Sequence, residues 1–126
     1  MKHPLTGAYK RIERADKHLQ EIKYELEILR QTQYDHMGVE HDPKTQKALI
    51  QVKQLIVPWC IVLAVSDCLH NLRSALDYII YELAKADAGK VQDGTQFLTE
   101  DTPERFKDNV KRRLKGLSSL HVDAVE

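Results

Sequence analysis

The residues of this chain that could carry out chemistry are concentrated at positions 66–84, SDCLHNLRSALDYIIYELA. At about 100° per residue, a helix over this stretch gathers short hydrogen-bonding side chains within roughly 120° of its surface. These side chains are Asp67, His70, Asn71, Ser74 and Asp77, with Arg73 at their edge. The polar stripe, as we call these six residues, contains neither Lys nor Glu, which normally cover a solvated helix face.

The polar stripe can be interpreted in three ways. A histidine can act as a general base or a metal ligand, and an arginine can hold a phosphate or carboxylate through two parallel hydrogen bonds. The same residue types also form buried polar layers that fix how helices pair. A Ser-His-Asp triad is disfavoured, because all three side chains project from one helix and no oxyanion hole is evident. We therefore take the stripe as a candidate ligand-binding site without catalytic or metal-binding residues, and leave a structural layer open.

Two long helices are predicted to position the stripe. Over 7–33, apolar residues alternate at spacings of three and four, as in a coiled-coil seam; they are Ile12, Ala15, Leu19, Ile22, Leu26 and Leu29. The second helix, over 58–87, starts with Pro58 in its first turn and ends before Gly89. Its wide apolar face marks it as the central helix.

The segment between these helices, 34–57, is ambiguous. Ala48, Leu49, Val52, Leu55 and Ile56 fit a helical stripe, whereas the sequence DPKT at 42–45 is good turn chemistry for a hairpin. The pattern alone leaves helix and hairpin open. Further along, Thr102-Pro103-Glu104 predicts the start of a helix over 103–115, and a short helix over 119–125 follows.

Size and composition indicate one domain over residues 1–126. Nineteen basic and nineteen acidic residues give a net charge of zero, so no global attraction to nucleic acid or anionic membrane is expected. The start has no apolar core of a secretory signal, and the longest apolar run, Leu55 to Val65, is too short for a membrane span. We expect a cytoplasmic protein with two reduced cysteines and no cofactor.

The string DCLHNLRSALD at 67–77 resembles a motif of a family of uncharacterised bacterial proteins, roughly G-D-x-L-H-N-L-R-S-A-L-D-H. The resemblance implies a hairpin before the long helix, which favours strands in the ambiguous segment. This chain differs in having Ser66 in place of Gly and Tyr78 in place of a His, which weakens any metal site. The family's sequences continue past the C-terminus of this chain, so a partner chain is expected to complete the core. The resemblance brings no established activity.

A weaker pattern concerns Arg30 and His36, which match the R-x4-6-H spacing of HEPN-type ribonucleases. In such an enzyme His36 or His70 would act as the base, and Arg30 or Arg73 would bind phosphate. RNA is thus a minor candidate partner.

Together these observations predict a mostly α, bundle-like fold. Two long antiparallel helices flank a β-hairpin, and one or two short C-terminal helices follow. The heptad seam and the wide apolar face favour a homodimer. The predicted function is a non-enzymatic small-ligand-binding or protein-interaction domain, with a HEPN-like RNA-cleaving hydrolase as the alternative.

Overall fold

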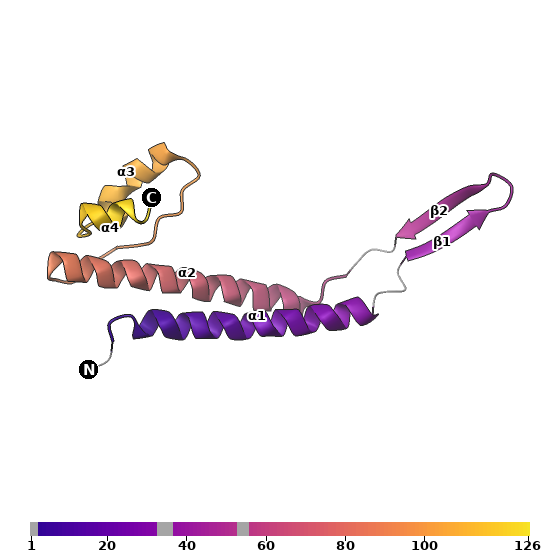
Figure 1. Ribbon diagram of the computed structural model, residues 1–126, viewed down its shortest axis with the longest axis horizontal. Helices are drawn as coiled ribbons and strands as arrows, with labels where there is room; N and C mark the ends of the chain where they lie inside the picture. Colours follow the sequence, from indigo (N-terminus) through magenta and orange to yellow (C-terminus); the bar gives the residue numbers. More distant parts are fainter. Residues whose placement is uncertain (1–2, 33–36, 53–55) are drawn as a thin grey trace. The chain divides into compact units, whose positions relative to one another are not determined.

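The computed structural model describes residues 3–32, 37–52 and 56–126. Its elements are α1 (Thr6–Thr32), β1 (Met37–Asp42), β2 (Lys47–Val52), α2 (Trp59–Ala88), α3 (Pro103–Arg113) and α4 (Ser119–Asp123) (Figure 1). The chain is 64% helical, with an antiparallel hairpin between the two long helices, so the predicted fold class is confirmed. Residues 33–36 and 53–55 of the predicted helix and hairpin lie outside the described residues.

The contacts divide the chain into two compact units, which are described separately. One consists of Met1–Asp16 with Cys68–Glu126, and the other of Lys17–Asp67. We refer to them as the C-terminal unit and the hairpin unit. The expectation of one domain over 1–126 stays a prediction. Among the described residues, no helix has the length and apolar character needed to cross a membrane.

In the C-terminal unit, small residues bring the start of α1 close to α2. Ala8, Ala15 and Ala75 are all buried, and the Cys68 Sγ lies 3.5 Å from the carbonyl oxygen of Ala15. Small side chains at such a contact let helix axes approach closely.

A second core lies on another side of α2, where the C-terminal helices pack. Its buried residues are Ile80, Leu98, Phe106 and Leu114. Helix α3 starts as predicted: the Thr102 side chain accepts a hydrogen bond from the backbone N–H of Arg105 at 3.3 Å, and Pro103 occupies the first turn.

In the hairpin unit, a local turn decides between helix and strand. Asp42 accepts hydrogen bonds from the backbone N–H of Lys44 at 2.9 Å and from the Thr45 hydroxyl at 2.7 Å. The hydrogen bond from Thr45 is the main cause that holds the pKa of Asp42 below its ordinary value, and the bond from Lys44 is the second. Gln46 then takes a φ of 58°, and the strands pair with Val39 opposite Ile50. The hairpin implied by the family resemblance is therefore present.

Candidate functional site

Two members of the polar stripe, Arg73 and Asp77, fasten the segment before α3 to α2. Arg73 donates from Nη2 to the carbonyl oxygen of Phe97 at 2.6 Å and from Nη1 to the Thr99 hydroxyl at 2.9 Å. The Asp77 carboxylate accepts the backbone N–H of Phe97 at 2.9 Å, and its oxygen lies 3.6 Å from the Arg73 Nε. These bonds flank Leu98, whose side chain is buried in the core. Both side chains therefore have a structural task.

The other members of the stripe have different surroundings. His70 is exposed and Ser74 is half-buried, and neither side chain makes a hydrogen bond or ion pair within the described part of the chain. Asp67 is exposed and Asn71 is half-buried, and each of them has an interaction partner. The structure thus brings all six predicted residues onto one helix without joining them into a single network. A ligand-binding role for the stripe stays a prediction.

Beside the stripe, the side chain of Tyr78 packs on the first turns of α1. The guanidinium carbon of Arg11 lies 4.9 Å from the centroid of the Tyr78 ring, in the geometry of a cation–π contact. A Cβ on Gly7 would lie 2.6 Å from the Tyr78 Cζ, so the ring occupies the space that a larger residue at position 7 would need. The sequence carries no signal for this contact, since a single Arg near a helix start is ordinary.

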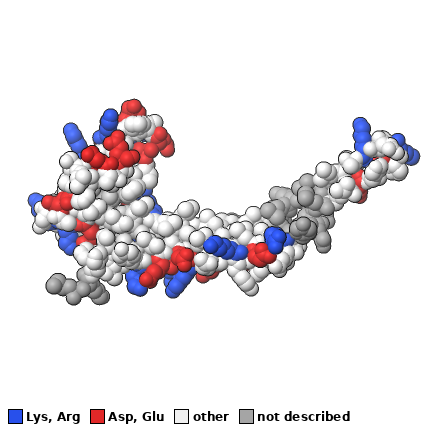
Figure 2. Space-filling model, in the orientation of Figure 1, with Lys and Arg blue, Asp and Glu red and all other residues white. Residues whose placement is uncertain are grey.

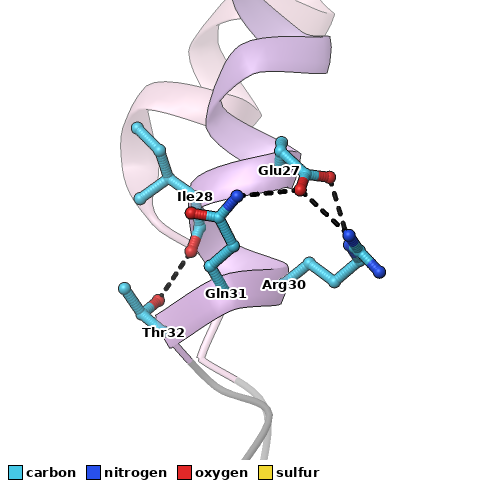
Figure 3. Close-up of polar contacts among 5 residues, drawn as sticks. All are labelled: Glu27, Ile28, Arg30, Gln31 and Thr32. Carbon is cyan, nitrogen blue, oxygen red and sulfur yellow. Dashed lines mark hydrogen bonds and ion pairs between the residues drawn. The ribbon is translucent and has the colours of Figure 1, made fainter.

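Arg30, the phosphate-binding residue of the ribonuclease hypothesis, is paired with a carboxylate on its own helix. Its Nε and Nη2 donate to the two oxygens of Glu27 at 3.1 and 3.0 Å, and Gln31 donates to the same carboxylate at 2.9 Å (Figure 3). The hydrogen bond from Arg30 is the main reason that the pKa of Glu27 is lowered, and the same bond raises the pKa of Arg30. His36 lies outside the described residues. Nothing in this geometry sets Arg30 apart from a surface ion pair.

An unpredicted Ser-His-Asp group joins the end of α2 to the start of α4. The Asp87 carboxylate accepts the backbone N–H of Ser118 at 2.7 Å and lies 2.7 Å from the His121 Nδ1. The Ser118 hydroxyl is 3.3 Å from that same Nδ1. A catalytic triad needs the carboxylate and the hydroxyl on opposite ring nitrogens, so this group anchors a helix start and does not form a relay. The signal in the sequence is the i,i+3 spacing of Ser118 and His121 at a helix start.

The described residues contain no group of three His, Cys, Asp or Glu side chains that could hold a metal ion. Comparisons with known proteins found no matching family model, no similar curated protein and no similar solved structure. The resemblance of the 67–77 motif to a bacterial family therefore stays a prediction.

A different kind of candidate site is formed by apolar side chains that the helices leave uncovered. On α2, Leu69 is 61% exposed and Leu72 is 41% exposed. With Val62 and Val65, which are also exposed, they make up what we call the α2 stripe. The α1 stripe consists of Ile12, Leu19 and Leu26, each more than 40% exposed. Figure 2 shows that the surface over α2 is nearly free of charged side chains in this view, while Lys, Arg, Asp and Glu gather over α1.

Proposed function

We propose that this chain is a non-enzymatic protein-interaction domain that binds its partner through exposed apolar side chains of α2, chiefly Leu69 and Leu72. The exposure of Leu69 and Leu72 carries this proposal. Burying a leucine side chain is worth roughly 1.5–3 kcal/mol, and soluble monomers rarely expose contiguous apolar patches larger than a few hundred Å². A row of such residues at helical spacing is therefore typical of a surface that binds another protein.

The polar contacts described above support a non-enzymatic role. Arg73, the phosphate-binding candidate of the polar stripe, and its neighbour Asp77 make their hydrogen bonds to residues 97–99. Arg30 faces Glu27. A cytoplasmic location belongs to the same proposal, and it agrees with Cys60 and Cys68 being free thiols.

Photo-crosslinking from single positions in living cells tests this proposal. A photoreactive phenylalanine analogue placed at Leu69 or Leu72 should give covalent adducts to protein. The matched control places the analogue at Lys107, which is an exposed residue of α3, and should give none. Crosslinks of equal yield from all three positions, or from no position, would contradict an interaction surface on α2.

The competing enzymatic hypothesis predicts a different result. Cleavage of single-stranded RNA or tRNA by the purified chain, lost in Arg30→Ala or His70→Ala, would overturn the non-enzymatic proposal.

A further inference from the structure

A cleft lies between the start of α1 and the second half of α2, and all the residues that line it belong to the C-terminal unit. Its volume is about 460 Å³. The walls include His3 and Gly7 on the side of α1, and Tyr78, Glu82 and Lys85 on the side of α2. Clefts that bind small ligands typically have volumes of roughly 300–1,000 Å³. The size of this cleft therefore suits a small molecule.

The helical spacing of α2 places three different polar groups on the wall of the cleft. Tyr78, Glu82 and Lys85 follow one another at intervals of four and three residues, so they share one face of the helix. They supply a phenol hydroxyl, a carboxylate and an ammonium group. This wall therefore offers a hydrogen-bonding group and one charge of each sign within two turns of helix.

The Tyr78 side chain is held in place by the first turns of α1. A Cβ at position 7 would lie 3.0 Å from the Tyr78 hydroxyl oxygen, so only glycine leaves room for the ring there. Arg11 stacks on that ring and also donates from Nη1 to the Gly7 carbonyl oxygen at 2.9 Å. The hydroxyl makes no hydrogen bond within the described part of the chain. It therefore remains available to a ligand.

Glu82 is the decisive residue, because its carboxylate is shielded from water without being satisfied by the fold. The side chain is 13% exposed, and its nearest cation, the Lys85 Nζ, lies 3.7 Å away. That distance is too long for a hydrogen bond. Among the residues that the structure describes, no donor bonds to the Glu82 carboxylate. Shielded polar groups normally have a partner, and one without a partner lowers stability. A ligand that donates to Glu82 would supply that partner.

Lys85 gives the cleft a positive group beside this negative one. Its side chain is 48% exposed, and all three ammonium protons are available because the contact with Glu82 is too long for a hydrogen bond. Together the two residues leave the wall with no net charge. A ligand that is only a cation would be repelled by Lys85, and one that is only an anion would be repelled by Glu82. A ligand with both charges is attracted by both residues.

His3 adds a hydrogen-bond donor on the other side of the cleft. Its Nδ1 accepts the backbone N–H of Leu5 at 3.2 Å, so the proton of the neutral imidazole is on Nε2. The His3 carbonyl oxygen accepts the Thr6 hydroxyl at 2.7 Å and the Thr6 backbone N–H at 2.9 Å. These bonds fix His3 against the first turn of α1. Its Nε2–H can donate to the same ligand group as Lys85.

We propose that this cleft binds a free α-amino acid. The ammonium group of the ligand donates to Glu82, and its carboxylate accepts hydrogen bonds from Lys85 and His3. An α-amino acid carries both charged groups on one carbon atom, which suits two protein charges only 3.7 Å apart. This site is independent of the proposed interaction surface, because neither Leu69 nor Leu72 lines the cleft.

Nuclear magnetic resonance of the ¹⁵N-labelled full chain tests the ligand class. The probes are the standard L-amino acids, each titrated separately. At least one should shift the amides of Gly7 and Lys85 saturably, with a Kd at or below about 1 mM. The amine and the carboxylic acid with the same carbon skeleton each lack one charged group, so they should bind at least about ten-fold more weakly. No saturable shift with any amino acid, or equal binding of either analogue, would overturn the proposal.

Two substitutions test the location of the site. Glu82→Gln and Lys85→Met should each raise the Kd of the bound amino acid by at least about ten-fold. The matched controls, Glu104→Gln and Lys107→Met, change exposed residues of α3 and should leave the Kd unchanged. Without ligand, Glu82→Gln should melt at the wild-type temperature or higher, because it removes a shielded charge. An unchanged Kd in Glu82→Gln would overturn the site, and a lower melting temperature would overturn the role assigned to its carboxylate.

Discussion

Replacing Asp77 by Ala tests whether the polar stripe stabilises the fold. The Asp77 carboxylate accepts the backbone N–H of Phe97 at 2.9 Å, and it also neighbours the Arg73 guanidinium that binds the Phe97 carbonyl group. Asp77→Ala removes the acceptor and leaves Arg73 as the only side chain of the pair that holds this segment. We expect the segment to loosen while α2 itself stays helical, because Ala favours a helix.

The magnitude follows from the type of bond and its exposure. A hydrogen bond to a charged group contributes about 1.5–3 kcal/mol when buried. The Asp77 side chain is 33% exposed, so water partly replaces the lost acceptor. We therefore expect the free energy of unfolding to fall by about 1–2 kcal/mol. Arg73→Ala should cost a similar amount, and the double variant should cost less than the sum, because both side chains hold Phe97.

Urea denaturation measures the stability change, and hydrogen exchange at the Phe97 amide locates it. The amide should exchange faster in Asp77→Ala than in the wild type. His70→Ala is the matched control on the same stripe, because His70 is exposed and should change stability by less than about 0.5 kcal/mol. If His70→Ala cost more than Asp77→Ala, or if Phe97 kept its protection in Asp77→Ala, the structural account of this pair would be refuted.

Three further predictions concern the C-terminal unit. The pKa of Asp87 is lowered in the folded chain, first by the Ser118 backbone N–H and then by His121. The stabilisation that the Asp87 carboxylate contributes is therefore complete above the ordinary pKa of 3.8, and it is lost as the pH falls through the lower pKa of the folded chain. The protection factors of the α4 amides against hydrogen exchange should therefore fall in that acid range, and Asp87→Ala should show the low protection at neutral pH; protection factors that depend on neither pH nor Asp87 would count against it. Leu114→Ala should cost roughly 2–5 kcal/mol in urea denaturation, because Leu114 is 2% exposed and the change leaves a cavity. Gly116→Ala should lower the melting temperature, because position 116 has a φ of 86° and a Cβ there would lie 2.7 Å from a Gln92 side-chain carbon; an unchanged or higher value would contradict this.

The sequence predicted the order and type of the elements well, because the strongest signals were local. At the start of α3, the Thr102 side chain accepts a backbone N–H of the first turn and Pro103 follows it, so the predicted cap is present. The hairpin was harder, because the apolar spacing after position 47 fits both a helix and a strand. The decisive interactions are the two bonds that Asp42 accepts, and these also arise within four residues of sequence.

The polar stripe could be located from the sequence, but the tasks of its residues could not. A helical wheel places His70 and Arg73 on the same turn, and it gives no reason to assign the two residues different roles. In the structure His70 is exposed, whereas Arg73 reaches Phe97 and Thr99, more than 20 residues away in the sequence. No periodicity encodes that distant partner. A structural role therefore holds for Arg73 and Asp77, whose side chains are about one third exposed, and it cannot be extended to the whole stripe from its composition.

The heptad seam of α1 shows why apolar spacing does not identify which residues are buried. Ala15 and Leu19 belong to the same predicted seam, yet Ala15 is 2% exposed and Leu19 is 41% exposed. Two helices approach most closely where their side chains are small, so the alanines of α1 and α2 occupy the contact line. Ile12, Leu19 and Leu26 lie to the flank of that line and stay more than 40% exposed, whereas Leu29 of the same seam is buried. The seam is therefore buried only in part by the chain's own fold, and Ile12, Leu19 and Leu26 remain exposed.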